Sequence, residues 1–368
     1  MAKTLRTSHD VLLLDLDGTL YAGNRVLPYA VEALAWPGTQ QANAPRCLYV
    51  TNNASRSVDE VAAHLNSLGF AATNSDIITS AHAAAKLLSV TLRANASSEG
   101  TVLVVGTDAL VEEVRAVGLS ATRSFGPEVI AVVQGHSTHT GWADLAEAAL
   151  AIRAGATWIA ANIDATLPTE RGLLPGNGSM VAALQAATNE TPIVAGKPGN
   201  QIFHDALSVD DFVSPLVVGD RLDTDIAGAN AMRLPSLYVM TGVSQPVDIL
   251  AALPGERPTY IGADLRALDS SPDVLRVKTG DDWSIHARGQ TAVTVSLKAS
   301  SDLGDSASAL RELAAVVWPI LDTSSPECTV SVVAQDAQSQ ALLNTWLQGK
   351  RVMTSACGRV SASVISDE

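Results

Sequence analysis

The sequence predicts an α/β protein built on a doubly wound parallel sheet, with a second α/β unit inserted into it and a small α+β domain at the C-terminus. Three short apolar runs each end in polar residues, helix-like stretches separate strand-like runs, and the pattern changes after residue 265. Unbroken apolar runs are typical of buried parallel strands. Alternation of strands and helices is typical of a doubly wound sheet.

Each of the three apolar runs has the length of a buried strand and stops at acidic or polar residues. In an open parallel sheet, ligands bind beyond the carboxyl ends of the strands, so these endings are expected to meet although they are about 200 residues apart in sequence. The runs and their endings are Val11–Leu14 before Asp15, Cys47–Val50 before Thr51-Asn52-Asn53, and Leu216–Gly219 before Asp220.

Helix-like stretches at Val58–Leu68 and Asn200–Leu207 flank a middle segment in which strand-like and helical patterns alternate again. This repetition predicts a second α/β unit, inserted into the first and large enough to cover its polar strand ends. The strand candidates of this unit are Thr101–Val105, Val129–Gln134 and Thr157–Ala161, and one helical pattern is Trp142–Ala154.

The C-terminal part begins after a linker signal at Ser270-Ser271-Pro272. Two strand candidates, Ala292–Leu297 and Cys328–Ala334, flank a helical pattern at Ser306–Leu321, which predicts a small third domain. The expected division of the chain is residues 1–79 and 196–265 for the first α/β unit, 80–195 for the inserted unit, and 270–368 for the C-terminal domain.

Charge and composition argue against several classes of partner. Twenty-four basic and 38 acidic residues give a formal net charge of −14, which opposes nonspecific attraction to nucleic acid or anionic lipid. No window reaches the roughly 18 uninterrupted apolar residues of a membrane-spanning helix, and the N-terminus shows no export signal. Three cysteines without a Cys-x-x-Cys pair predict neither a disulfide framework nor a zinc site. We therefore expect a cytoplasmic protein that binds neither nucleic acid nor membranes.

The segment Asp15-Leu16-Asp17-Gly18-Thr19 places two carboxylates at positions i and i+2 after a buried strand, with a glycine that allows a tight turn. One carboxylate can attack as a nucleophile while the other transfers a proton. The alternative is a pair of ordinary acids at a strand end. Two acids on the buried side of a sheet need cations or hydrogen bonds, so the catalytic interpretation is favoured.

Four motifs in this order resemble those of the haloacid dehalogenase superfamily. Each motif alone has an ordinary structural explanation, because Gly-Lys-Pro is a common turn and Thr-Asn-Asn a common loop or helix cap. All four at strand ends, in the family's order, are highly specific. The motifs are Asp15-Leu16-Asp17-Gly18-Thr19, Thr51-Asn52-Asn53, Gly196-Lys197-Pro198 and Gly219-Asp220-Arg221-Leu222-Asp223-Thr224-Asp225.

The resemblance implies a phosphomonoester hydrolase that acts through an aspartyl-phosphate intermediate. Asp15 would be the nucleophile and Asp17 the general acid, which protonates the leaving alkoxide and later activates water. Mg²⁺ would be held by Asp15, the backbone carbonyl of Asp17, and Asp220, since a hard cation prefers oxygen ligands. Asp225 is expected just outside these ligands.

The resemblance also implies an electrostatic cradle for the phosphoryl group. Thr51 and the amides of Asn52 and Asn53 would bind the phosphoryl oxygens, while Lys197 would neutralise charge and position Asp15. Most of the rate enhancement should arise from this cradle.

Three charged residues near the motifs have a second interpretation. Lys197 has the alternative of a solvated loop lysine. Arg56 either orients the substrate or begins a helix. For Asp223, an ordinary structural role is favoured over a catalytic one.

The inserted unit resembles the cap of the type IIA branch, a type C2 cap between the second and third motifs. This branch is related to bacterial nucleotide phosphatases and to mammalian pyridoxal phosphate and phosphoglycolate phosphatases. By the resemblance, the loop Asn162–Leu174 faces the leaving group, so Asn162 and Asp164 are expected to bind substrate. The segments that match the flap and the cap signature of the branch are Tyr21–Pro28, Asn162–Pro168 and Pro175–Ser179.

By layout, the C-terminal extension resembles that of actinobacterial family members that hydrolyse glycerol 3-phosphate and carry an appended piece similar to part of an acetyltransferase. The extension lacks an acetyl-CoA pyrophosphate loop of the form Gln/Arg-x-x-Gly-x-Gly/Ala, so acetyl transfer is not expected. The extension should instead pack on the core or form a contact in a homo-oligomer.

Glycerol 3-phosphate is therefore the first expected substrate among small phosphorylated metabolites. The presumed specificity loop has few cationic residues, which suits a modest polar leaving group. Nucleoside monophosphates and phosphoglycolate are alternatives within the same chemistry. From another class, a non-catalytic sensor or scaffold for phosphorylated metabolites would be expected to have lost the nucleophile or the acid, and both are present.

Overall fold

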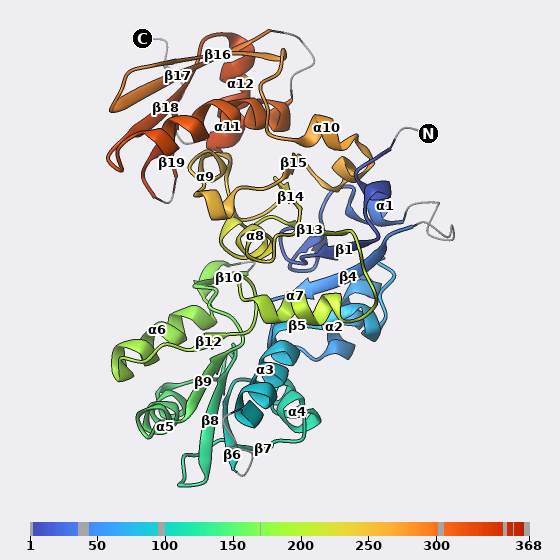
Figure 1. The fold of residues 1–368 in the computed structure, drawn as a ribbon, viewed down its shortest axis with the longest axis vertical. Coiled ribbons are helices and arrows are strands. Elements are labelled where there is room, and N and C mark those ends of the chain that lie inside the picture. Colours follow the sequence, from blue (N-terminus) through green and yellow to red (C-terminus); the bar gives the residue numbers. More distant parts are fainter. Residues whose placement is uncertain are drawn as a thin grey trace.

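The computed structural model describes residues 3–35, 44–94, 100–169, 171–300, 305–348, 352–355 and 357–363. It has three parts arranged along the long axis of the molecule (Figure 1). A parallel sheet with helices on both faces lies in the middle, the inserted α/β unit at one end and the C-terminal part at the other. This architecture confirms the predicted fold class. The limits of the domains stay a prediction.

The central sheet has six parallel strands in the order β15-β14-β13-β1-β4-β5. The three apolar runs of the sequence are thus the adjacent strands β13, β1 and β4. The chain adds strands first on one side of β1 and later on the other, and a sheet forms a ligand-binding crevice at such a switch point. The strands are β1 Val11–Leu14, β4 Arg46–Thr51, β5 Ile77–Thr79, β13 Pro215–Gly219, β14 Ser236–Val239 and β15 Tyr260–Gly262.

Successive residues of β1 enter different apolar clusters, because strand side chains alternate between the two faces of a sheet. Leu12 and Leu14 pack with residues of α1, α2 and the 3₁₀ helix η5. Val11 and Leu13 pack with residues of α3, α7 and α8. The sheet is therefore buried on both faces. The helices are α1 Ala30–Leu34, α2 Val58–Ser67, α3 Ser80–Ala94, α7 Asn200–Leu207, α8 Ala227–Ala231 and η5 Leu265–Asp269.

The inserted unit contains a five-stranded parallel sheet in the order β12-β9-β8-β6-β7. Helices α3 and α4 cover one face and α5 and α6 the other. Because α3 also packs on the central sheet, one apolar cluster continues from the core into the inserted unit. The elements are β6 Thr101–Val105, α4 Asp108–Ala116, β7 Ser120–Thr122, β8 Val129–Gln134, α5 Trp142–Arg153, β9 Thr157–Ala160, α6 Asn177–Thr188 and β12 Ile193–Val194.

Two antiparallel hairpins lie in segments that the sequence assigned to a flap and a loop. The hairpin of β2 (Tyr21–Ala22) and β3 (Arg25–Val26) lies in the predicted flap. The hairpin of β10 (Thr166–Thr169) and β11 (Gly172–Pro175) lies largely within the predicted loop Asn162–Leu174. β11 leads directly into the segment Gly176-Asn177-Gly178, where α6 begins, and it belongs to a hairpin and not to a parallel βαβ unit.

The C-terminal part has a five-stranded mixed sheet in the order β16-β17-β18-β20-β19. Along β17, Val293, Val295 and Leu297 are buried with α11 and α12, while Thr294 and Lys298 are exposed. One face of this sheet is therefore packed and the other faces solvent, as alternating strands predict. The elements are β16 Trp283–Arg288, β17 Ala292–Ala299, α11 Ser306–Thr323, β18 Thr329–Ala334, α12 Ala337–Leu347, β19 Val352–Thr354 and β20 Val360–Ser363.

The extension packs on the core, which confirms one of its two expected roles. Buried residues of α9 and of the fourth motif belong to the same apolar cluster as α11 and β17. At the edge of this cluster, Trp318 Nε1 donates to the carbonyl of Ile249 at 2.9 Å, and Arg257 pairs with Asp322 at 2.6 and 2.7 Å. The contact in a homo-oligomer stays a prediction. The remaining helices are α9 Pro246–Leu250 and α10 Pro272–Leu275, with short turns η1 Arg6–Ser8, η2 Asn74–Asp76 and η4 Pro254–Glu256.

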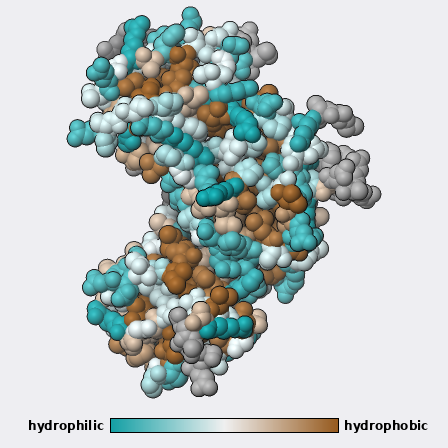
Figure 2. Space-filling view, viewed as in Figure 1, coloured by the Kyte–Doolittle hydropathy of each residue, from teal (hydrophilic) through white to brown (hydrophobic). Residues whose placement is uncertain are grey.

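The surface mixes hydrophilic and apolar side chains over all three parts on the face that Figure 2 shows. Within the described ranges, no helix combines the length and the apolar composition needed to cross a membrane.

The shared cluster predicts that the extension and the core unfold together. Leu313→Ala in α11, where Leu313 is 0% exposed, should lower the free energy of unfolding by about 2–5 kcal/mol, because it leaves a cavity in this cluster. We expect one unfolding transition, shifted to lower urea concentration, for far-UV circular dichroism and for tryptophan fluorescence alike.

The matched control is Leu253→Ala, whose side chain is 60% exposed and should change stability by less than about 0.5 kcal/mol. Two separate transitions, with only one shifted by Leu313→Ala, would show that the core does not depend on the extension.

Candidate active site

Polar residues from three neighbouring strand ends meet at one edge of the central sheet. Asp15 follows β1, Asp220 follows β13, and Thr51 is the last residue of β4. A cavity of about 280 Å³ lies at this edge. Core residues and residues of the inserted unit line it together, so both parts of the molecule form the site. The lining residues from the inserted unit are His136, Asn162, Asp164, Thr166, Leu167, Gly176 and Asn177.

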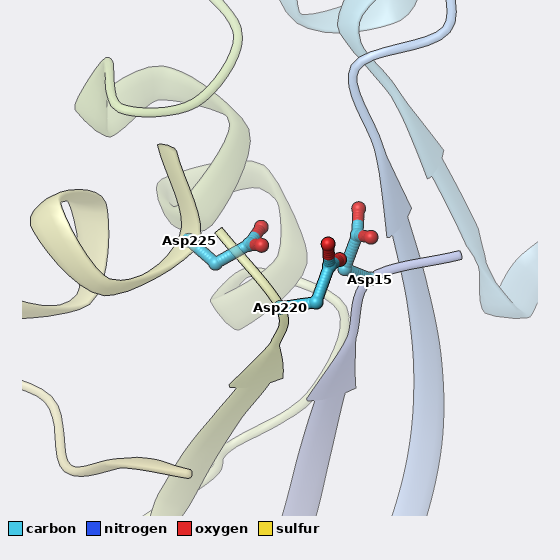
Figure 3. A group of neighbouring side chains, drawn as sticks. All are labelled: Asp15, Asp220 and Asp225. Atoms are coloured by element: carbon cyan, nitrogen blue, oxygen red, sulfur yellow. The ribbon is translucent and has the colours of Figure 1, made fainter. Parts of the chain in front are cut away.

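Three carboxylates form a cluster beside this cavity (Figure 3). Asp15 and Asp220 project from the ends of neighbouring strands, and Asp225 follows in the π-helical turn η3 (Leu222–Ile226). One oxygen of each carboxylate lies within 4.8 Å of an oxygen of each of the others. The first and fourth motifs, far apart in sequence, thus supply one acidic group of side chains.

Lys197 compensates part of this negative charge. Its ammonium donates hydrogen bonds to Asp15 Oδ1, to Asp225 Oδ1 at 2.6 Å and to the carbonyl of Val50 at 3.1 Å. The residue is 2% exposed. This burial excludes the alternative of a solvated loop lysine.

The electrostatics of the cluster follow from burial and from the closeness of like charges. Burial raises the pKa of all three carboxylates, to about 6 for Asp225 and well above the ordinary range for Asp220. Lys197 acts in the opposite direction on Asp15 and Asp225, because its positive charge stabilises their ionised forms. Burial alone would lower the pKa of Lys197, but the two carboxylates outweigh it and the pKa is raised.

The charge balance of the cluster fits a bound divalent cation. Three ionised carboxylates and one ammonium leave two negative charges in excess, 3 − 1 = 2. Like charges this close need a cation or protonation to be stable together. Carboxylate oxygens are the donors that a hard cation such as Mg²⁺ prefers. Asp15 and Asp220 fit as its ligands, and Asp225, held by Lys197 and by the Arg221 amide at 3.1 Å, fits a place just outside.

Two glycines pack directly against Asp220. A Cβ atom added to Gly18 would lie 2.5 Å from Asp220 Oδ2, and one added to Gly242 would lie 1.9 Å from the same oxygen. Gly18 also has a φ of +91°, which favours glycine. The amide of Val243 at 2.6 Å and the hydroxyl of Thr19 at 3.2 Å donate to the carboxylate. Asp220 is therefore held tightly on the side where these two glycines lie.

Asp17, the second acid of the first motif, lines the cavity and remains accessible to solvent. Partial removal from water raises the pKa of Asp17, although a hydrogen bond from the Gly23 backbone and the charge of Arg56 act in the opposite direction. A carboxyl group with a raised pKa keeps its proton to higher pH, which suits a general acid.

The loop after β4 contains the predicted phosphate-binding residues, and Thr51, Asn52 and Asn53 all line the cavity. Thr51 Oγ1 accepts a hydrogen bond from the Asn53 amide at 3.1 Å. The carboxamide oxygen of Asn53 accepts from the amide and the hydroxyl of Ser55, both at 2.8 Å. These local bonds form a tight turn before α2, whose N-cap is Ser57. Phosphate binding by these residues stays a prediction.

The side chain of Asn52 joins three separate segments. Its Oδ1 accepts from the Lys197 amide at 2.8 Å, and its Nδ2 donates to the Lys197 carbonyl at 3.0 Å. Nδ2 also donates to both oxygens of Asp164, at 3.1 and 3.2 Å. The carbonyl of Asn52 accepts from Asn162 Nδ2 at 2.6 Å. Asn52 therefore connects the core, the lysine loop and the inserted unit, a role that its motif position did not indicate.

Two arginines line the cavity beside the predicted residues. Arg56 precedes the N-cap of α2 and so does not begin that helix. Arg221 pairs with Asp223 at 2.7 Å, which gives Asp223 the structural role that was favoured for it. Arg221 stands inside the fourth motif, so its sequence position alone could have indicated a place in the site.

His136 also lines the cavity and was not among the predicted site residues. It lies two residues beyond β8. A polar residue at the end of a predicted parallel strand was the signal that identified Asp15 and Asp220, and the same signal was available for His136.

Comparison with protein families supports the relation that the motifs indicate. A family model described as haloacid dehalogenase-like hydrolase matches residues 12–120, and one described as HAD-hydrolase-like matches residues 194–268. The D-glycerol 3-phosphate phosphatase of Mycobacterium tuberculosis is 50% identical over 348 residues, which cover 94% of this chain and 96% of that protein. A 5'-nucleotidase of Bacillus subtilis is 36% identical over 252 residues, which cover 67% of this chain and 93% of that protein.

Solved structures agree with this relation. The crystal structure of a glycerol phosphate phosphatase from Mycobacterium tuberculosis in complex with magnesium matches with a TM-score of 0.82 at 50% identity, and the match covers 94% of this chain and 99% of that one.

The packing around Asp220 predicts that Gly242 cannot be enlarged. Gly242→Ala should displace the Asp220 carboxylate and weaken Mg²⁺ binding, measured by isothermal titration calorimetry, by about 10- to 100-fold.

The matched control is Gly255→Ala, because an added Cβ there meets no atom within 4 Å, and we expect its Mg²⁺ affinity to equal that of the unaltered protein. Equal affinity in a folded Gly242→Ala protein would show that Asp220 is not a ligand.

Proposed function

Because the chain belongs to the family of haloacid dehalogenase-like hydrolases, we propose that it hydrolyses glycerol 3-phosphate to glycerol and phosphate, with Mg²⁺ as cofactor. The chain is a phosphatase, and the substrate is the finer part of the proposal. The observation that carries it is the buried contact of Lys197 with Asp15, which fixes a carboxylate beside a cation at the end of β1.

Similarity over nearly the whole chain supports glycerol 3-phosphate in preference to a nucleotide. The match to the D-glycerol 3-phosphate phosphatase covers 94% of the chain and therefore includes most of the C-terminal extension. The match to the 5'-nucleotidase covers 67% of the chain.

In the first step, a carboxylate oxygen of Asp15 attacks phosphorus and the bond from phosphorus to the ester oxygen breaks. Asp17 gives its proton to the leaving alkoxide, which departs as an alcohol. Lys197 keeps Asp15 ionised and oriented, because its ammonium is held by Asp225 and by the Val50 carbonyl as well. The product of this step is an aspartyl phosphate.

In the second step, Asp17 acts as a base. Its carboxylate takes a proton from water, and the water oxygen attacks phosphorus of the aspartyl phosphate. The bond from phosphorus to the Asp15 oxygen breaks, so inorganic phosphate leaves and Asp15 is restored. Asp17 ends the cycle with the proton that it needs for the next substrate.

The proposed ligands of Mg²⁺ are Asp15, Asp220 and the backbone carbonyl of Asp17. When bound, Mg²⁺ supplies positive charge that makes the phosphoryl group a better electrophile. Thr51 and the amides of Asn52 and Asn53 are the proposed contacts of the phosphoryl oxygens, and all three residues line the cavity.

A non-catalytic sensor is not supported by the site. Asp15, Asp17, Lys197 and Asp220 are all present. Asp15 and Asp220 belong to the carboxylate cluster, and Lys197 pairs with Asp15. We place the enzyme in the cytoplasm, because Cys47, Cys328 and Cys357 are all free thiols and a reducing compartment keeps thiols in that state.

The proposed substrate is tested by measuring phosphate release from a panel of esters in the presence of Mg²⁺. We expect the highest kcat/KM for glycerol 3-phosphate, with nucleoside monophosphates, phosphoglycolate and pyridoxal phosphate well below it. The physical reason is the lining of the cavity. Its cationic side chains are already paired with acids or lie close to them, which suits a modest polar leaving group such as glycerol.

The control for this panel is Asp15→Asn, which keeps the shape of the side chain but removes the nucleophile. Its kcat should fall by at least about 10⁴-fold, because removal of a nucleophile abolishes the covalent route. A clear preference for another ester would replace the substrate, and normal turnover by Asp15→Asn would refute the mechanism.

Metal removal gives a separate prediction. Prolonged dialysis against EDTA should abolish phosphate release, because the buried carboxylates lose the charge that compensates them, and added Mg²⁺ should restore it. Circular dichroism of the depleted protein serves as the control for folding. Full activity of folded protein without metal would contradict the assigned cofactor.

A further inference from the structure

The acid of the inserted unit that the sequence assigns to substrate binding, Asp164, is bonded to the core instead. Both of its carboxylate oxygens accept from Asn52 Nδ2, at 3.1 and 3.2 Å. The residue is half-buried and lines the same cavity as Asp15 and Asp17. Its main polar contact is therefore with the second motif, which belongs to the other part of the molecule.

The same carboxamide of Asn52 holds the backbone of Lys197 on both sides. Its Oδ1 accepts from the Lys197 amide at 2.8 Å, and its Nδ2 donates to the Lys197 carbonyl at 3.0 Å. The fit is close, because a Cβ added to Gly196 would lie 2.6 Å from Asn52 Oδ1. The ammonium of Lys197 in turn pairs with the nucleophile Asp15. A continuous chain of contacts thus leads from Asp164 to Asp15.

Asp164 helps to determine which way this carboxamide points. If the carboxamide were reversed, its oxygen would face the Asp164 carboxylate and the Lys197 carbonyl, and its NH₂ group would face the Lys197 amide. Acceptors would then meet acceptors and donors would meet a donor. A carboxylate is a strong acceptor for an amide N–H. One orientation of Asn52 is therefore favoured, and it is the one that bonds Lys197 twice.

Asp164 can fix this orientation because its own backbone is held by the inserted unit. Its amide donates to Asn162 Oδ1 at 3.2 Å, and its carbonyl accepts from the Gly178 amide at 2.9 Å. Asn162 Nδ2 also donates to the Asn52 carbonyl at 2.6 Å. The carboxylate is thus carried on a rigid support, which precise positioning of a catalytic group requires.

The charges around Asp164 favour its role as an acceptor. Burial raises the pKa of Asp164, but the positive charge of Arg221 and the hydrogen bonds from Asn52 act in the opposite direction, because they stabilise the ionised form.

We propose that Asp164 is a positioning residue, which orients the Asn52 carboxamide so that Lys197 stands correctly against Asp15. This inference rests on the proposed function. It makes the inserted unit a part of the catalytic apparatus as well as of the cavity lining. Misplacement of a catalytic group by about 1 Å can cost about 100-fold in rate, even when the altered residue lies away from the reacting atoms.

The test measures kcat and KM of Asp164→Leu and Asp164→Asn with glycerol 3-phosphate and with p-nitrophenyl phosphate, whose leaving group lacks the hydroxyls of glycerol. Leucine accepts no hydrogen bond, so the Asn52 amide loses a partner. We expect kcat to fall by about 10- to 100-fold on both esters, with KM changed by less than about threefold. Asparagine keeps one acceptor oxygen and should restore most of kcat.

A double-mutant comparison asks whether Asp164 acts through Asn52. Asn52→Leu keeps the backbone amide of the second motif but removes the carboxamide, and it should lower kcat at least as much as Asp164→Leu. The variant with both changes should be no slower than Asn52→Leu alone, because the bond between the two side chains is already absent. A merely structural role of Asp164 would make the two losses multiply.

The control variant is Asp108→Leu, the same change in the inserted unit at a side chain that is 98% exposed. We expect its kinetics to match those of the unaltered enzyme on both esters. Circular dichroism checks the folding of every variant. If Asp164→Leu does not fold, Asp164→Ala replaces it, with the same expected results.

Three results contradict the inference. A loss confined to glycerol 3-phosphate and expressed in KM would make Asp164 a substrate-binding residue, unchanged kinetics would give it no role in the reaction, and multiplying losses would give it a structural one. If the unaltered enzyme hydrolyses only p-nitrophenyl phosphate, the proposed substrate is wrong, and that ester alone still decides the role of Asp164. If it hydrolyses neither ester, the proposed function and the inference both fail.

Discussion

The ammonium of Lys197 between the carboxylates of Asp15 and Asp225 is the interaction on which the site depends. Buried carboxylates at the ends of β1 and β13 repel one another, and burial makes their ionised forms costly. A single buried cation reduces this cost, yet the cluster remains negative. The same imbalance that destabilises the empty cluster provides affinity for a divalent cation. Catalytic capacity and local instability therefore have one physical cause.

The surrounding structure holds this lysine in place mainly through Asn52. Its carboxamide bonds both the amide and the carbonyl of Lys197, so the lysine loop cannot shift without breaking two hydrogen bonds. The same carboxamide reaches Asp164 of the inserted unit. The position of the inserted unit is thus coupled to the position of the lysine, and one side chain links the inserted unit with the residue that pairs with Asp15.

The C-terminal extension lies behind the fourth motif and not at the cavity. Leu222 and Ile226, which flank Asp225, belong to the same apolar cluster as α11. Loop 241–245, which holds Asp220 through the Val243 amide, leads directly into α9, and α9 packs in this cluster. The extension therefore packs against the segments that carry Asp220 and Asp225. This packing gives it a structural role in the site.

The sequence by itself determined the elements and the chemistry that depend on local pattern. Strands β6 and β8 and helix α7 have the expected bounds, because apolar periodicity is a property of neighbouring residues. The convergence of Asp15, Thr51 and Asp220 followed from their places at the ends of parallel strands.

Only the tertiary structure decided three features: Asn52 joins three segments, His136 lines the cavity with ring nitrogens that have no hydrogen-bond partner among the described residues, and the predicted loop Asn162–Leu174 contains a hairpin. These features are contacts between segments separated by up to 145 residues. They depend on the distances that packing sets between whole elements, and no local pattern of residue types encodes those distances.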